Sequence, residues 1–337
     1  MVRHRKIAQT EKECFTRLAE VGFQSNSQLH SLDKSIAISI SPSASGKPFR
    51  RGLLLIGGFG DPPHIWEGIA ERASKAGWYA LAPRTPGWGR TNFNEAKNLS
   101  WTDWVLACRD ALVMIRGICV DVTIVAHSTG APVAAMVIEL FPVERLILTG
   151  PNFVSNPRDL WGRRLVLTPF VGPLVSAYFG TIPKKKRQER PVDNLNTELY
   201  KTGFYLTCFP VHTLREMCLL QEQLSRKWKV LGEVVMLMGD SDQSVGPLEA
   251  QAAAVRKFVP ENIPFRHLRV PNAAHGLPTE TEGVVDTLAG IVLQDVAVLD
   301  KLVHLNEKGA GGVDGATRAI ASDNSTGHAS EALKKSL

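Results

Sequence analysis

Short strand-like runs alternate with helical patterns along most of the chain, and this alternation constrains the fold more than any other feature. The runs are mostly apolar, short and closed by small or turn-forming residues, which suits strands buried on both faces. They are GLLLIGG, YALAP, VTIVA, RLILTG, VVMLMG and FRHLRV, beginning at residues 52, 79, 122, 145, 234 and 265. The rhythm predicts an α/β protein with a mostly parallel, doubly wound sheet covered by helices on both faces.

Amphipathic stretches and caps place the helices between these strands. A capping box formed by Ser100 and Asp103 opens one of them. The predicted helices span residues 65–76, 100–116, 131–140, 248–258 and 279–304. Before the first buried strand, residues 10–22 fit a short helix and residues 35–40 alternate as an edge strand does.

The rhythm stops after residue 150 and resumes after residue 230, so we expect an insertion of helices and loops between them. The last residues are rich in Gly, Ala and Ser and low in apolar side chains, which is typical of a disordered tail. The predicted division is an N-terminal extension (1–50), a core (51–150 and 231–305), an insertion (151–230) and a tail (306–337).

Composition excludes several classes of protein. Hydrophobic residues make up 44% and charged residues 21% of 337 residues, the balance of a globular protein. The N-terminal stretch is polar and no apolar run approaches the roughly 20 residues of a membrane span, so we expect a cytoplasmic protein. No CxxC pair occurs, so zinc and redox motifs have no support. The five cysteines are Cys14, Cys108, Cys119, Cys208 and Cys218.

The sharpest chemical signal is Ala126-His127-Ser128-Thr129-Gly130, set between a predicted strand and a predicted helix. A serine nucleophile must project from a tight turn so that a base and a carbonyl group can both reach it. Small residues two positions before and after the serine let strand and helix approach, and here these are Ala126 and Gly130. The pattern predicts a nucleophile elbow at Ser128.

A nucleophilic serine needs a base, and the base needs an orienting carboxylate, on loops that follow later strands. His275 follows the last predicted strand, and both Asp240 and Asp242 follow the strand before it. Asp242 stands three residues after the glycine that closes its strand and is preferred; Asp240 is then interpreted as a turn residue bonding its own backbone. We expect His127, although it adjoins Ser128, to point away from the nucleophile.

Backbone N–H groups must stabilise the oxyanion of a tetrahedral intermediate. One donor should be Thr129, directly after the nucleophile. The second should come from the glycine-rich turn after the first buried strand, where Gly57 and Gly58 bring the Phe59 amide into the site. Neither GxGxxG nor a GK[ST] motif occurs, which argues against a nucleotide site.

Residues from about Arg51 to His304 resemble the α/β-hydrolase superfamily. GGFGDPPHIW, LAPRTPGWGRT and SWTDWVLACRDAL are similar to its bacterial carboxylesterase and monoacylglycerol lipase branch. The resemblance implies a helical cap inserted after the family's sixth strand, and hydrolysis of small-molecule esters or lipids with medium or long acyl chains, without metal or cofactor. It makes Ser128 the nucleophile, Asp242 the acid, His275 the base, and Phe59 and Thr129 the oxyanion donors. Two family histidines are replaced, by Gly57 and by Trp88.

Positive charge is concentrated in the insertion. Residues 151–230 carry 13 basic and 6 acidic side chains, a net charge of +7, whereas the whole chain carries +6. One hypothesis is a lipophilic lid, with an apolar face over Leu165–Val175, that docks transiently on anionic membrane surfaces. The preferred alternative is a cap that packs on the core and lines an apolar pocket. The basic run Pro183–Arg187 is interpreted as a solvated loop, and no surface favours nucleic acid.

Three functions are compatible with this set of residues. The first is ester hydrolysis through an acyl-enzyme on Ser128. The second keeps the triad for another reaction, such as C–C bond hydrolysis, acyl transfer or perhydrolysis. The third is a non-hydrolytic receptor that uses the pocket for binding. Fold alone does not choose among them, and the sequence leaves the oligomeric state open.

Overall fold

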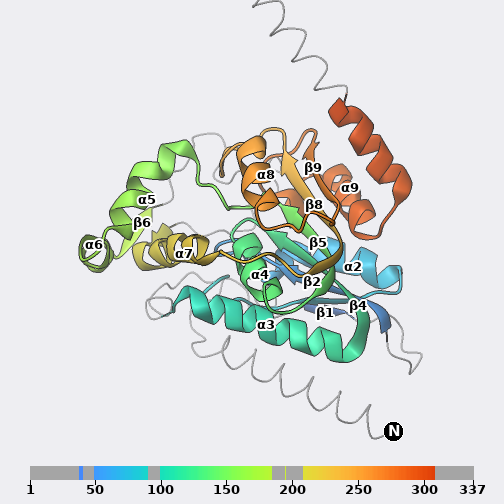
Figure 1. Ribbon diagram of the computed structural model, residues 1–337, viewed down its shortest axis with the longest axis horizontal. Coiled ribbons are helices and arrows are strands. Elements are labelled where there is room, and N and C mark those ends of the chain that lie inside the picture. The colour runs from blue at the N-terminus through green and yellow to red at the C-terminus, as the bar shows by residue number, and fades with distance from the viewer. Residues whose placement is uncertain (1–37, 41–48, 90–98, 184–193, 195–207, 308–337) are drawn as a thin grey trace, which may run out of the picture.

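The computed structural model describes residues 38–40, 49–89, 99–183, 194 and 208–307, and its main sheet confirms the predicted fold class (Figure 1). Strands β3, β2, β4, β5, β8 and β9 lie side by side in this order and pair in parallel, while β1 pairs antiparallel with β3 at the edge. The strands are β1 Ile38–Ile40, β2 Phe49–Ile56, β3 Tyr79–Ala82, β4 Cys119–His127, β5 Val143–Thr149, β8 Val230–Gly239 and β9 Phe265–Val270.

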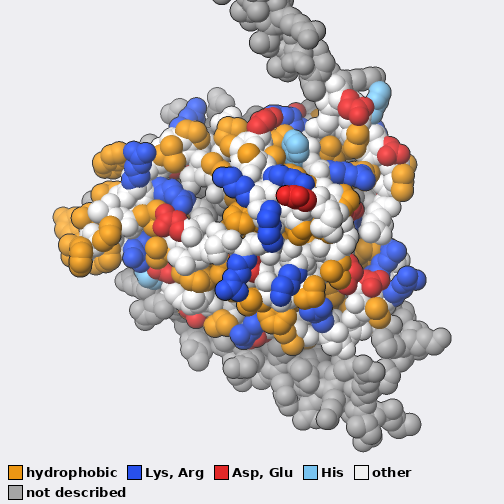
Figure 2. Space-filling view, viewed as in Figure 1, with side chains coloured by type: hydrophobic (Ala, Val, Ile, Leu, Met, Phe, Trp, Pro, Cys, Tyr) orange, Lys and Arg blue, Asp and Glu red, His pale blue; other side chains and the backbone are white. Residues whose placement is uncertain are grey.

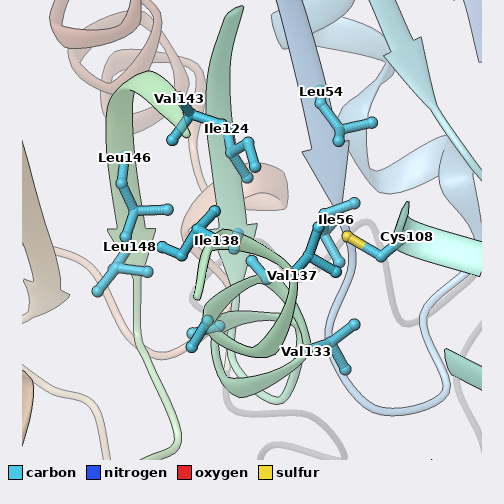
Figure 3. Packing of buried hydrophobic residues seen from close by; sticks show 14 of the residues in the cluster. Leu54, Ile56, Cys108, Ile124, Val133, Val137, Ile138, Val143, Leu146 and Leu148 are labelled. Atoms are coloured by element: carbon cyan, nitrogen blue, oxygen red, sulfur yellow. The ribbon is translucent and has the colours of Figure 1, made fainter. Parts of the chain in front are cut away.

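Side chains of the central strands are buried on both faces, as the apolar runs predict. In β2, Leu54 and Ile56 face one layer of helices, whereas Leu53 and Leu55 face the other. Figure 3 shows the first layer, with Val137 and Ile138 of one helix directed at sheet side chains. That layer holds α3 Trp101–Ile118, α4 Gly130–Ile138 and α8 Leu248–Arg256; the second holds α2 Glu67–Lys75 and α9 Glu282–Val292.

Several predicted elements appear with small changes of boundary. The capping box of α3 is present, since the Ser100 N–H donates to Asp103 Oδ2 at 2.8 Å. The helix predicted over residues 65–76 begins with a 3₁₀ turn, Pro63–Trp66, because proline suits the first turn of a helix. The first buried strand begins at Phe49, two residues before the predicted boundary of the core. The helix predicted over residues 10–22 lies outside the described residues.

The prediction of one helix over residues 279–304 is wrong. Helix α9 ends before Gln294, whose φ of 65° is left-handed, and a second helix covers residues 296–307. Asp295 starts this second helix, because its carboxylate accepts the Ala297 N–H at 3.0 Å. This second helix runs to residue 307, next to the predicted tail boundary at 306, and Asn306 donates to the Arg269 carbonyl and accepts its N–H. Asn306 thereby covers part of the exposed edge of β9. The rest of the predicted tail lies outside the described residues.

The predicted insertion, residues 151–230, follows β5 and is called the insertion segment below. In Figure 1 its helices lie together to one side of the main sheet. Val166, Val211 and Cys218 form a small apolar cluster between them. No described helix is both long and apolar enough to cross a membrane. The elements are α5 Leu160–Leu167, α6 Val171–Phe179, β6 Thr181–Pro183, β7 Cys208–Pro210 and α7 Val211–Gln223, with β6 and β7 paired antiparallel.

Candidate active site

The structure brings the three predicted catalytic side chains into one hydrogen-bonded chain. Ser128 follows β4, Asp242 follows β8 and His275 follows β9, so all three lie at the carboxyl ends of parallel strands. His275 Nε2 is 2.9 Å from Ser128 Oγ, and His275 Nδ1 is 2.8 Å from Asp242 Oδ2. This geometry lets the imidazole take a proton from the hydroxyl while the carboxylate fixes its tautomer.

The turn that carries Ser128 is tight and strained. Ser128 has a φ of 50°, a left-handed conformation that non-glycine residues seldom adopt. Its N–H donates to the Thr149 carbonyl at 2.9 Å, which ties the turn to β5. A Cβ at Gly130 would lie 2.3 Å from the Gly57 carbonyl oxygen, so only glycine fits there. Ala126, opposite Ile56 of β2 and Leu148 of β5, is fully buried, and its side chain lies in the layer shared with α4.

Asp242 and Asp240 have separate tasks. The Asp242 side chain is fully buried; it accepts from His275 and from the Ser244 N–H at 2.9 Å. Burial raises the pKa of Asp242. The positive charge and hydrogen bond of His275, together with the Ser244 N–H, lower the pKa by more than burial raises it, so the pKa of Asp242 lies below its ordinary value. Asp240 instead accepts the Asn272 N–H at 3.1 Å. The predicted bonding of Asp240 to its own turn is wrong: its carboxylate braces the neighbouring loop that leads to His275.

The glycine turn after β2 lies against the elbow. A Cβ at Gly58 would be 2.8 Å from Ser128 Cβ, so glycine is needed for this close approach. The turn is closed by Asp61, which accepts the Gly58 N–H through Oδ2 at 2.9 Å and donates its own N–H to the Gly58 carbonyl at 3.0 Å. Phe59 packs edge-on against Trp88, with ring centroids 6.1 Å apart. Trp88 replaces a histidine of the family that the sequence resembles, and it is therefore part of an apolar wall beside this turn.

His127 is a site residue that sequence reasoning dismissed. Its ring centroid lies 4.9 Å from that of His275, so it packs beside the base instead of standing away from the site. Its Nδ1 lies 2.9 Å from the Thr149 carbonyl, which can only accept, so Nδ1 carries the hydrogen. Burial and then the charge of His275 lower the pKa of His127 to about 3. His127 is therefore neutral at ordinary pH and adds no charge beside the base.

The low pKa of His127 predicts a pH-dependent loss of stability. The unfolded chain takes up a proton at this histidine below its ordinary pKa of 6.5, whereas the folded chain does not until about 3. The free energy of unfolding should therefore fall as pH drops through this window, by up to about 1.4 kcal/mol per pH unit. His127→Asn keeps a donor for the Thr149 carbonyl and should remove that slope in urea titrations between pH 6 and 4.

A matched control is the exposed His304, whose replacement by asparagine should keep the wild-type slope. Equal slopes in wild type and His127→Asn would show that His127 does not titrate in this way.

No other described group competes with Ser128 as a nucleophile at this site. Cys108, Cys119 and Cys218 are buried thiols that form no disulfide. Burial raises the pKa of Cys108 to about 12, which keeps it protonated and unreactive. Within the part of the chain that the structure describes, no three His, Cys, Asp or Glu side chains gather as metal ligands would.

A doubly wound sheet with a serine elbow and a histidine and an aspartate on the following loops defines the class of α/β-hydrolases. The chain belongs to the alpha/beta hydrolase family, whose model matches residues 53–287. It is 28% identical over 91 residues to the thermostable monoacylglycerol lipase of Bacillus sp. (strain H-257); the match covers 27% of this chain and 36% of that lipase.

Solved structures share the fold at low identity. A structure from the metagenome-derived lipolytic enzymes LipS and LipT has a TM-score of 0.60 at 17% identity, covering 77% of this chain and 98% of that one. A soluble variant of the monoglyceride lipase of Saccharomyces cerevisiae has a TM-score of 0.58 at 13% identity, with 77% and 89% covered. The monoacylglycerol lipase of Paleococcus ferrophilus gives 0.56 at 13% identity, with 77% and 96% covered. These likenesses concern the fold alone.

Proposed function

We propose that the protein is a serine hydrolase that cleaves apolar acyl esters through an acyl-enzyme on Ser128. The observation that carries the proposal is the hydrogen-bonded chain from Ser128 through His275 to Asp242, with links of 2.9 and 2.8 Å. His275 removes the Ser128 hydroxyl proton as Oγ bonds to the ester carbonyl carbon. Asp242 stabilises the imidazolium that forms, and His275 then gives its proton to the departing alcohol. Water repeats the sequence on the acyl-enzyme and releases the acid.

The developing oxyanion would be held by the amides of Phe59 and Thr129. The close approach of Gly58 to Ser128 supports this assignment, because it places the turn carrying Phe59 beside the nucleophile. Thr129 is the N-cap residue directly before α4, and the positive end of that helix favours an anion there. Such donors contribute only when charge appears on the carbonyl oxygen, which is what accelerates the chemical step.

The insertion segment supports an apolar substrate. Its apolar side chains form two sets, one packed between its helices and one exposed. Val166, Leu167 and Val175 pack toward α7 within the insertion segment. Other members of the apolar face predicted over Leu165–Val175 are exposed, namely Phe170, Val171 and Leu174. Figure 2 shows hydrophobic side chains gathered at the α6 end of the molecule. The exposed set, with its exposed fractions, is Trp161 (76%), Phe170 (87%), Leu174 (69%) and Tyr178 (84%).

Exposed aromatic side chains on a segment with a net charge of +7 also support transient docking of this segment on anionic lipid surfaces. The segment would thus cover the site and present it to esters at an interface. The lipolytic relatives named above agree with this substrate class.

A p-nitrophenyl ester series from acetate to palmitate, with emulsified monoacylglycerol, tests the function. We expect hydrolysis that rises from the acetyl to the medium-chain esters, because longer acyl chains bury more apolar surface, about 0.8 kcal/mol per methylene. Folded protein that hydrolyses none of these esters would contradict the proposal and favour the receptor or another triad reaction.

A variant carrying Trp161→Ser, Phe170→Ser and Leu174→Ser separates the interface from the chemistry. We expect about tenfold lower activity on the emulsion and little change on soluble short esters, since exposed apolar side chains act only at a lipid surface. An equal loss on both kinds of substrate would exclude the docking role.

A further inference from the structure

We propose that Asn152 is a positioning residue that holds the Thr129 amide in place and links it to helices α7 and α5 of the insertion segment. The inference rests on the proposed function, in which the Thr129 amide is an oxyanion donor. Asn152 follows β5, and sequence reasoning assigned it no role. It contacts the elbow through both its backbone and its side chain.

The backbone contact fixes a peptide plane. The Asn152 N–H donates to the Ser128 carbonyl at 3.1 Å, and the Ala131 N–H donates to the same oxygen at 3.1 Å. The Ser128 carbonyl and the Thr129 N–H belong to one planar trans peptide, in which they point in opposite directions. Two donors on the carbonyl therefore set the direction of the Thr129 N–H on the other side of the plane.

The side-chain contact fixes the Thr129 residue itself. Asn152 Nδ2 donates to Thr129 Oγ1 at 3.4 Å, and this hydroxyl in turn donates to Met217 Sδ of α7 at 3.3 Å. The Thr129 hydroxyl thus accepts one hydrogen bond and donates another. Asn152 holds the amide that follows the nucleophile from two directions while lying outside the Ser128–His275–Asp242 chain.

Helix α7 in turn holds Asn152. Gln221 of α7 donates through Nε2 to the Asn152 backbone carbonyl at 2.6 Å and to Asn152 Oδ1 at 3.1 Å. Since Oδ1 accepts from Gln221, the Asn152 amide is oriented with Nδ2 toward Thr129. Gln221 Oε1 accepts from Arg163 of α5. A continuous series of hydrogen bonds thus runs from α5 through α7 to the elbow.

Through this series of hydrogen bonds, the position of α7 affects the rate of the chemical step. If α7 shifted, Gln221 would release the Asn152 side chain, and the Thr129 amide would lose one of its supports. A small misplacement of a group that acts only in the transition state lowers kcat without weakening ground-state binding.

The test uses the full chain with Asn152→Ala, Gln221→Met and the double variant, assayed on p-nitrophenyl butyrate. We expect Asn152→Ala to lower kcat by about 10- to 100-fold with KM within threefold, and to slow fluorophosphonate labelling of Ser128 by a similar factor. Gln221→Met should lower kcat by about three- to tenfold, and the double variant should be no slower than Asn152→Ala, because both changes interrupt one series.

Asn156→Ala is the matched control, since Asn156 lies in the same loop but donates to Gln243 O at 2.8 Å, away from the elbow. It should keep kcat within twofold, which separates positioning from a general loosening of the loop. An Asn152→Ala enzyme that matches wild-type kcat, or losses that multiply in the double variant, would overturn the inference while the proposed function stands. Wild-type protein that the probe does not label would overturn both.

Discussion

Replacing Ser128 with alanine should lower kcat for p-nitrophenyl esters by about 10⁵-fold and abolish labelling by a fluorophosphonate probe. The hydroxyl is the only group of the hydrogen-bonded chain that would bond to substrate, and removing such a nucleophile leaves only the residual effect of binding and the oxyanion donors. The Cβ of residue 128 stays in place, so the left-handed turn need not change. Labelling followed by intact mass and a steady-state ester assay measure both effects.

Ser241→Ala is the control for this experiment, because Ser241 also follows a strand at the same end of the sheet but bonds Asp240 instead of a histidine. It should be labelled and should turn over like wild type. Labelling of Ser128→Ala at the wild-type rate would place the nucleophile elsewhere.

Replacing Asp242 with asparagine should lower kcat by about 10³- to 10⁴-fold. The amide is the same size as the carboxylate, but it cannot stabilise the imidazolium, and it favours the wrong tautomer of His275. The effect should appear in kcat more than in KM, since the group does not contact the substrate. Steady-state kinetics above pH 6, where the lowered pKa of Asp242 keeps the wild-type carboxylate ionised, measure it.

Asp240→Asn is the decisive comparison for Asp242. Asp240 accepts the Asn272 and Ala273 N–H groups at 3.1 and 3.4 Å, so its loss should lower thermal stability and affect kcat less than tenfold. If Asp240→Asn were the more damaging of the two substitutions in the chemical step, the assignment of the acid would be wrong.

The sheet and the serine turn could be predicted because their signals are local. A buried parallel strand is a short apolar run, and an elbow is five neighbouring residues between a strand and a helix. Ser128, Asp242 and His275 could be placed together because parallel strands end at one edge of a sheet. Nothing more than the order of strands and loops was needed for that step.

The rest depends on contacts between residues distant in the chain. The task of Asp240 is set by Asn272, and the neutrality of His127 is set by burial beside Thr149. Asn152 has no sequence motif; its importance comes from Ser128 and Gln221, which only the folded chain brings near. The break at Gln294 has a local signal, the Asp295 cap of the following helix, which the prediction did not use.

The direct pairing of β5 with β8 has a consequence for how this protein could diversify. The pairing is parallel and Val143 lies opposite Val230, so the insertion segment leaves β5 at one edge of the sheet and returns to the opposite edge, and the paired strands fix both points whatever lies between them. Because the entropy of closing a loop rises only about 0.6 kcal/mol with each doubling of its length, segments of other sizes can be grafted between these strands at little thermodynamic cost. Exchange of this segment is therefore a route to new specificity, provided that each graft keeps Asn152 and supplies a partner for it.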